Sequence, residues 1–148
     1  MTAPSRTLFV NLPVADVARS TAFFTALGFA FDPAFTDGTT AACMLVSEHA
    51  RVMILSREKF AEFSHLPVGD PTTHALALFS FSVPSRADVD AVGAAALAGG
   101  GREADGAEDH GFMYSRSFFD LDGHGWQVMW MDPAAAQPDV EEVAASTV

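Results

Sequence analysis

The sequence repeats one pattern twice, and this internal repeat limits the fold more than any other feature. In each copy, an apolar strand-like run is followed by a short turn, an amphipathic helix and a glycine that ends the helix. The strand, the helix and the glycine stop lie at 7–14, 16–27 and Gly28 in the first copy, and at 74–83, 85–98 and 99–101 in the second. The chain is therefore expected to fold as two similar halves.

Each helix has one apolar face, and further strand-like runs follow it. Spacing of three and four residues predicts the buried faces, which are Val17, Thr21, Phe24 and Leu27 in the first helix and Val89, Val92 and Ala96 in the second. The later runs are 29–35, 39–47 and 51–56 in the first half, and 112–119 and 125–131 in the second, where a short polar segment precedes 112 and a tight turn covers 120–123. Neither half covers its own sheet, so the halves are expected to pack against each other or against a second chain.

These elements predict an α+β fold in a single domain over residues 1–133, because 148 residues are too few for two independent domains. The expected parts are a first module at about 7–56, a connector at 57–73, a second module at about 74–133 and an acidic, alanine-rich tail at 134–148. Within the connector, 57–65 is expected to form a short helix with Phe60 and Phe63 facing inward. After Pro138, the tail is expected to form a loose helix or to fray.

Charge and cysteine content exclude several classes of function. Eight Lys and Arg against 19 Asp and Glu give a net charge of −11, which argues against nucleic-acid and membrane-surface partners and would attract a cationic ligand. Cys43, the only cysteine, lies in an apolar run and is expected to be buried and inert. The sequence has no signal-peptide pattern and no apolar run near the ~20 residues that span a bilayer. The expected location is therefore the cytoplasm.

Two groups of residues carry a family resemblance. One is Val14-Ala15-Asp16-Val17 followed by Phe23-Phe24 and Leu27-Gly28-Phe29, and the other is Asp120-Leu121-Asp122-Gly123-His124 followed by Trp126-Gln127-Val128. Over residues 7–133, the sequence resembles the vicinal oxygen chelate superfamily, which contains glyoxalase I, bleomycin-resistance proteins, fosfomycin-resistance enzymes and extradiol dioxygenases. The resemblance implies paired βαβββ modules that form an open, curved barrel around a cleft. It also implies a homodimer, in which the modules pair within one chain or across two.

In metal-using members of this superfamily, four side chains from matched strands hold one divalent ion. Carried over by spacing, these positions fall on Phe9, Leu78, Gln127 and, within one residue, Ile54. The side chains of Phe, Leu and Ile have no lone pair, and a single amide cannot hold such an ion in water. No metal and no other cofactor is therefore expected.

The same positions predict a pocket for a small molecule, because alternate residues of a strand share a face. Apolar side chains combine there with a few amides and hydroxyls: Phe9, Asn11, Leu76, Leu78, Ser80, Gln127 and Met129. The alternative is that Phe9, Leu78 and Met129 simply belong to the core. Asn11 and Gln127 are more informative, because an amide on an apolar strand needs a buried partner or a ligand.

A second group of candidates lies at 109–116. His110 lies where a mobile loop could bring a polar group to the cleft, and Tyr114 and Arg116 share one face of a strand, where they could bind one ligand together. The alternative is an outward-facing Tyr114 and an Arg116 paired with an acidic residue. Which face of 112–119 lines the cleft stays open.

Histidines and tryptophans outside these groups have simpler interpretations. His124 is expected to be structural, and His74 begins a strand from which it could reach the cleft. Trp126 and Trp130 alternate with Gln127 and are expected on the opposite face.

Four functions are consistent with these features. The leading hypothesis is a glyoxalase-like protein that binds a small organic molecule in an apolar cleft without the usual metal, and either sequesters it or acts on it by acid–base chemistry. The alternatives are a drug-sequestering protein of the bleomycin-resistance type, a metal-dependent lyase or dioxygenase with non-standard ligands, and an interaction module. The last would require Asn11 and Gln127 to be buried and to satisfy each other.

Overall fold

The computed structural model describes residues 3–135, which form eight strands, three α-helices and a 3-10 turn. In chain order the elements are β1 (Leu8–Val14), α1 (Val17–Ala26), β2 (Ala30–Asp32), η1 (Pro33–Phe35), β3 (Ala41–Ser47), β4 (Ala50–Ser56), α2 (Arg57–Phe63), β5 (Leu78–Ser82), α3 (Arg86–Ala98), β6 (Arg102–Asp109), β7 (Met113–Phe119) and β8 (Gly125–Met131). The predicted tail lies mostly outside the described residues. Among the described residues, no helix is long and apolar enough to cross a bilayer.

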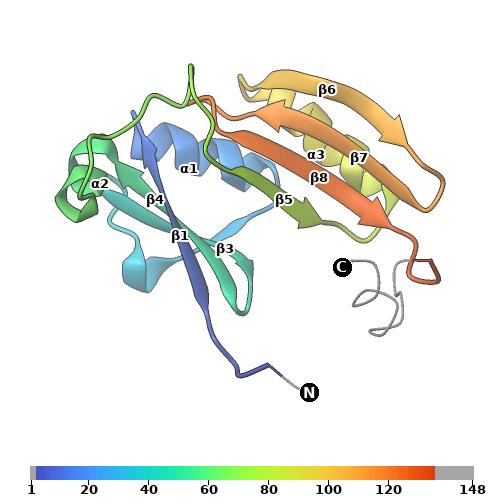
Figure 1. Ribbon diagram of the computed structural model, residues 1–148, viewed down its shortest axis with the longest axis horizontal. Helices are drawn as coiled ribbons and strands as arrows, with labels where there is room; N and C mark the ends of the chain where they lie inside the picture. Colours follow the sequence, from blue (N-terminus) through green and yellow to red (C-terminus); the bar gives the residue numbers. More distant parts are fainter. Residues whose placement is uncertain (1–2, 136–148) are drawn as a thin grey trace, which may run out of the picture.

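The strands form two four-stranded sheets with the same topology. The first sheet has the order β1-β4-β3-β2 and the second has the order β5-β8-β7-β6. In each sheet one parallel pair, β1 with β4 or β5 with β8, is joined to antiparallel neighbours. Each half therefore follows the order βαβββ, and Figure 1 shows the two open, curved sheets side by side with α1 and α3 behind them. The α+β fold predicted from the repeat is confirmed.

The helices begin and end where the sequence predicts. The side chain of Asp16 accepts a hydrogen bond from the backbone N–H of Arg19, and Ser85 accepts one from that of Asp88. Gly28 follows α1 with a φ of 105°, a left-handed conformation that glycine adopts without strain. Local capping chemistry thus fixes both helices.

Three expected elements differ from the structure. The run 29–35 is only partly a strand, because Pro33 has no N–H to donate and a 3-10 turn begins there. The polar segment after Gly101 forms β6, whose eight residues are all exposed; its charged side chains suit an unprotected sheet edge and hide the usual alternation. Residues 74–77 precede β5 instead of extending it, because the register pairs Leu78 with Gly125, where β8 begins.

The two halves share one hydrophobic core. Helix α1 contributes Phe23 and Phe24, which are buried against Phe118 and Trp126 of the second sheet. The ring centroids of Phe24 and Trp126 are 5.0 Å apart. Because α1 packs against both halves, the face of each sheet that carries these residues is the inner face. Cys43, by contrast, is buried as expected but outside this cluster.

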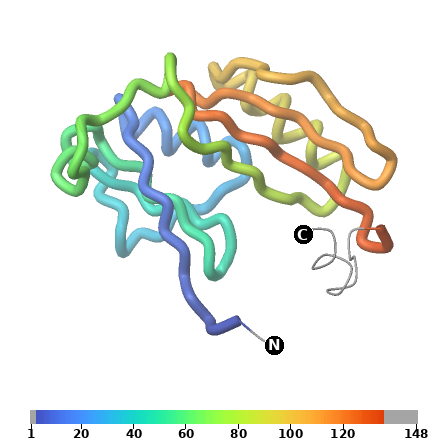
Figure 2. Tube along the Cα trace, viewed as in Figure 1, coloured from blue at the N-terminus to red at the C-terminus, as the bar shows by residue number. Residues whose placement is uncertain are grey.

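Polar contacts join the halves at the turn between β7 and β8. The carboxylate of Asp122 accepts a hydrogen bond from the backbone N–H of Ala15 at 2.8 Å and from the hydroxyl of Ser20 at 3.3 Å. Nε2 of His124 lies 2.9 Å from the carbonyl oxygen of Pro13. His124 therefore has the structural role expected for it. Figure 2 shows the connector (green) passing beside this turn (orange).

The second face of each sheet, which we call the open face, points away from the shared core. Alternation and strand register place on it the following side chains: Phe9, Asn11 and Pro13 of β1; Arg51, Met53 and Leu55 of β4; Leu78, Ser80 and Ser82 of β5; Ser115 and Ser117 of β7; and Gln127, Met129 and Met131 of β8. Several large apolar side chains on this face are exposed in the single chain. The open face therefore carries the positions at which the sequence predicts a cleft.

Candidate functional site

The candidate site is a groove on the open face of the first sheet, centred on Asn11 and Phe60. Two cavities meet at these residues. One, of about 240 Å³, lies under the connector and is lined by Asn11, Leu12, Pro13, Phe60, Gly69, Asp70, Pro71, His74, Ala75, Leu76, Ala77, Phe79, Gly123, His124 and Gly125. The other, of about 490 Å³, lies beside α2 and is lined by Asn11, Leu55, Phe60, Phe63 and Ser64. We call them the connector cavity and the α2 cavity, and together the Asn11 groove.

Helix α2 forms one wall of the groove, because it contacts β1 and β4. Ser56 caps the helix by accepting a hydrogen bond from the backbone N–H of Lys59. Phe60 faces inward, as the sequence predicts, and is half-buried. The inward placement expected for Phe63 is wrong, because its side chain is 64% exposed at the rim of the α2 cavity.

Asn11 is the least satisfied polar side chain of the groove. Its side chain is exposed, and its amide makes no hydrogen bond with any residue between 3 and 135, so the amide is open to solvent in the single chain. An amide carries both donors and an acceptor, so a molecule in either cavity could bond with it in two directions. Asn11 is thus free to bind a ligand in the described part of the chain.

His74 and Asp70 bring ionisable groups to the connector cavity. The carboxylate of Asp70 accepts hydrogen bonds from the backbone N–H of Thr72 at 2.9 Å and from its hydroxyl at 2.6 Å, which hold the pKa of Asp70 below its usual range. The backbone N–H of His74 bonds to the carbonyl oxygen of Asp70 at 3.0 Å, and its Nδ1 lies 2.8 Å from the hydroxyl of Thr73. This turn therefore holds His74 at the wall of the cavity, consistent with the expectation that His74 could reach the cleft.

Gln127 lies on the open face of the second sheet and has protein partners. Its Oε1 accepts a hydrogen bond from the hydroxyl of Ser80 at 3.1 Å, and its Nε2 donates to Ser115 at 3.5 Å. Met129 and Leu78 share this face, and Leu78 is 78% exposed. The structure does not bring Gln127 and Asn11 together, so the two amides do not satisfy each other. An interaction module of the kind described above receives no support from them.

Phe9 lies on the open face of the first sheet and is 47% exposed. The guanidinium carbon of Arg51 lies 6.0 Å from the centre of its ring, and Nη1 of Arg51 bonds to Asp32 at 3.0 Å. The sequence does not single out Arg51, because nothing in its sequence neighbourhood separates it from an ordinary strand residue. Phe9 is thus a surface residue of the open face in the single chain and not part of the core.

Tyr114 and Arg116 lie on the inner face of the second sheet, against α3. The hydroxyl of Tyr114 donates to the carboxylate of Asp90 at 2.6 Å, and this bond is the main reason why the pKa of Tyr114 is raised. Arg116 lies against Gly93 and reaches Glu103 at 3.5 Å. The face of β7 that accompanies Gln127 is therefore the one with Ser115. Tyr114 and Arg116 point away from that face.

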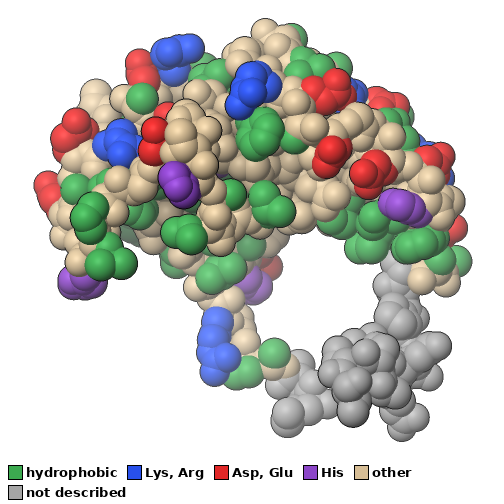
Figure 3. All heavy atoms as spheres, turned by 45° about the horizontal axis from the view of Figure 1, so that its top comes forward, with side chains coloured by type: hydrophobic (Ala, Val, Ile, Leu, Met, Phe, Trp, Pro, Cys, Tyr) green, Lys and Arg blue, Asp and Glu red, His purple; other side chains and the backbone are tan. Residues whose placement is uncertain are grey.

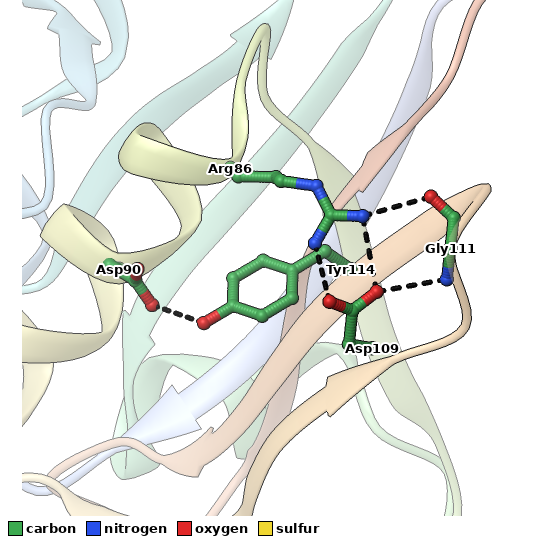
Figure 4. A network of polar contacts seen from close by, with 5 residues as sticks. All are labelled: Arg86, Asp90, Asp109, Gly111 and Tyr114. Atoms are coloured by element: carbon green, nitrogen blue, oxygen red, sulfur yellow. Dashed lines mark hydrogen bonds and ion pairs between the residues drawn. The ribbon is translucent and has the colours of Figure 1, made fainter.

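Arg86 fixes the hairpin that carries His110 (Figure 4). Its guanidinium donates to both carboxylate oxygens of Asp109, at 2.8 and 3.1 Å, and to the carbonyl oxygen of Gly111 at 2.9 Å. The rings of Tyr114 and Trp130 lie 5.2 and 4.9 Å from its guanidinium carbon. This bond with Arg86 holds the pKa of Asp109 below its usual range. The loop expected to be mobile is thus anchored. The sequence does not single out Arg86, because the residues around it indicate only the start of a helix.

His110 itself is exposed at the tip of this hairpin. Its Nε2 lies 3.6 Å from Glu108, and its ring centre lies 6.5 Å from that of Phe112. It lines none of the cavities at Asn11. His110 is therefore separate from the groove in the single chain.

The residues at the superfamily's metal-ligand positions do not fit a divalent ion. Phe9 and Leu78 offer no lone pair, and Gln127 is already engaged with two serines. Ile54 is fully buried on the inner face, so the third position falls on Met53 or Leu55, within the stated one residue. Neither is a ligand for a hard cation. Within residues 3–135, no group of three His, Cys, Asp or Glu side chains has a geometry that could hold a metal.

Comparison with known proteins agrees with the fold described above. The family described as bleomycin resistance protein-like N-terminal matches residues 6–47. A hypothetical protein from S. aureus has a similar structure, with a TM-score of 0.73 and 21% identity over 86% of this chain and 95% of that one. A glyoxalase-related enzyme from Fulvimarina pelagi gives 0.72 and 16% over 86% and 88%, and a lactoylglutathione lyase from Agrobacterium tumefaciens gives 0.61 and 15% over 86% and 95%. No curated protein sequence matches the chain.

These similarities confirm the fold that the resemblance to the vicinal oxygen chelate superfamily implies. The chain has the glyoxalase/bleomycin resistance/dioxygenase-like fold of that superfamily. At identities this low, the similar structures define the fold and leave the chemistry to the residues of the site.

Proposed function

We propose that the protein binds a small, largely apolar organic molecule in the Asn11 groove, without the divalent ion of its metal-using relatives. The free amide of Asn11, on the wall of two adjoining cavities, is the observation that carries this proposal. Apolar walls supply affinity through burial, and one convergent amide supplies orientation. His74 places an imidazole on the wall of the connector cavity, so acid–base chemistry on the ligand would use this residue.

A homodimer is part of this proposal. Phe9, Leu78 and Met131 expose large apolar surfaces on the open faces of both sheets, and Figure 3 shows hydrophobic side chains (green) reaching the surface at several places. Apolar surface of this kind is stabilised by contact with a second protein surface. A second copy that places its second sheet over the first sheet of its partner would cover these side chains and close the groove.

The test is a titration with benzyl alcohol, a small neutral probe with an apolar ring and one hydroxyl. The readout is the amide and side-chain shifts of the ¹⁵N-labelled protein. We expect saturable shifts at Asn11 and its neighbours, and a loss of affinity of about fivefold in Asn11→Leu, which keeps the branched shape of the side chain and removes the hydrogen bonds. Thr25→Val, which removes a hydroxyl of α1 outside both cavities, is the control and should bind as the wild type does. Equal affinity in Asn11→Leu and the wild type would contradict the proposal.

Sequestration of a cationic drug, as in bleomycin-resistance proteins, is a second candidate. It is favoured by the family match over residues 6–47 and by the net charge of −11. Calorimetric titration of the protein with bleomycin tests it. Heat that saturates at a fixed stoichiometry supports sequestration, and a titration without protein-dependent heat removes this candidate.

A further inference from the structure

We propose that the connector cavity selects small organic cations, with an ammonium group paired to Asp70 and an apolar body held between Phe60 and Phe79. This inference rests on the proposed function, because it names the class of ligand for one part of the Asn11 groove.

The charge at the cavity is a fixed carboxylate. One oxygen of Asp70, Oδ1, accepts both hydrogen bonds from Thr72. The other, Oδ2, has no hydrogen-bond partner among residues 3–135. Since the two bonds to Oδ1 stabilise the ionised form, Asp70 is an anion at neutral pH with one oxygen available to a ligand.

No positive side chain neutralises this carboxylate by direct contact in the described part of the chain. Arg57 and His74 both act electrostatically on Asp70, but Nη2 of Arg57 donates to the carbonyl oxygens of Val68 and Gly69. No Lys or Arg lines the connector cavity. A ligand in this cavity therefore meets the carboxylate of Asp70 with no Lys or Arg side chain beside it, and the imidazole of His74 is the basic group that shares the cavity.

The remaining walls suit the body of an organic cation. Phe60, Leu76 and Phe79 line the cavity, and the aromatic faces can stabilise a nearby positive charge. Anionic ligands would be repelled by Asp70 and also by the net charge of −11.

The second half of the chain holds Asp70 in place. A Cβ atom added to Gly123 would lie 2.9 Å from the carbonyl oxygen of Pro71 and 3.1 Å from Cα of Thr72. Gly123 also has a φ of 98°, which glycine adopts without strain. The turn at 70–73 thus packs directly on the turn between β7 and β8, and both enclose the cavity.

Three probes of similar shape test the inference: benzylamine, benzyl alcohol and benzoate, titrated into the full-length ¹⁵N-labelled protein. We expect benzylamine to bind about fivefold more tightly than benzyl alcohol, the size of an ion pair near a protein surface, and benzoate to bind most weakly. In Asp70→Asn, the turn should persist because asparagine closes the same type of turn, and the preference for benzylamine should disappear.

Asp37→Asn is the matched control. Asp37 closes a similar turn by accepting from the backbone N–H groups of Thr39 and Thr40, but it does not line the cavity. This variant loses the same charge and should keep the preference. Benzoate binding as tightly as benzylamine, a preference that survives in Asp70→Asn, or its equal loss in Asp37→Asn would overturn the inference. Benzyl alcohol that binds without any preference for benzylamine would overturn the cation inference alone, whereas no response at Asn11 to any probe would overturn the proposed function as well.

Discussion

Asp120 holds together the turn that joins the two halves, and its removal should destabilise the protein strongly. Its carboxylate accepts three hydrogen bonds, from the indole Nε1 of Trp126 at 2.9 Å and from the backbone N–H groups of Asp122 at 2.9 Å and His124 at 3.0 Å. The side chain is buried, and burial is the main reason why the pKa of Asp120 is raised. In Asp120→Ala, three donors would lose their acceptor at one position.

The expected cost follows from these three bonds. Each unsatisfied donor costs about 1–2 kcal/mol, so three of them cost about 3–6 kcal/mol. Part of this loss of stability is offset, because the variant no longer has to desolvate a buried carboxylate when it folds. We therefore expect a loss of about 3 kcal/mol in the free energy of unfolding. With a urea m-value of about 2 kcal/mol/M, the midpoint should fall by about 1.5 M.

Urea denaturation followed by tryptophan fluorescence measures this change. Asp132→Ala is the control, because within residues 3–135 the side chain of Asp132 accepts a single exposed hydrogen bond, from the backbone N–H of Ala134, and its loss should change stability by less than about 0.5 kcal/mol. A midpoint in Asp120→Ala within about 0.2 M of the control would refute the reasoning that this carboxylate joins the halves.

Three further predictions concern the core, the cavity and the hairpin. Phe24→Ala should lower the free energy of unfolding by about 3–5 kcal/mol in urea denaturation, because Phe24 is buried against both halves; a change below about 1 kcal/mol would contradict a shared core. Gly123→Ala should accelerate hydrogen exchange at the backbone N–H of Thr73, because its Cβ would displace the connector turn; unchanged exchange would show that the turn does not depend on this contact. Asp109 has a lowered pKa through Arg86, so its ion pair stabilises the fold above the ordinary pKa and loses this effect as pH falls through the lowered value. The wild type should therefore lose stability at acid pH through this ion pair, and Asp109→Asn should lack that part of the loss in acid titrations monitored by circular dichroism. Identical acid profiles of the variant and the wild type would show that the ion pair with Arg86 does not contribute to stability.

The sequence predicts the parts of the fold that depend on local chemistry. The caps at Asp16 and Ser85, the apolar faces of α1 and α3, and the turn that carries Asp120 all follow from neighbouring residues. Strand β6 was missed because an exposed edge strand needs charged residues instead of apolar alternation. Its formation as a strand depends on pairing with β7, and local sequence patterns do not show which strands pair.

The site was predictable only in part for a similar reason. Alternation placed Asn11 on the cleft side of β1, but it could not decide between the two faces of β7, since each carries aromatic residues. The structure decides through Tyr114, whose hydroxyl bonds to Asp90 of α3. The cavity at Asn11 depends on α2 and the connector, two segments brought to β1 by packing between residues far apart in the sequence.

The central claim is that a small molecule occupies the groove at Asn11. Intermolecular nuclear Overhauser effects between benzyl alcohol and the ¹³C,¹⁵N-labelled protein test it most directly. We expect contacts from the ring of the probe to the ring protons of Phe60, and from its methylene group to the side-chain amide of Asn11. Contacts confined to the open face at Gln127 and Met129, with none at Asn11 or Phe60, would contradict it.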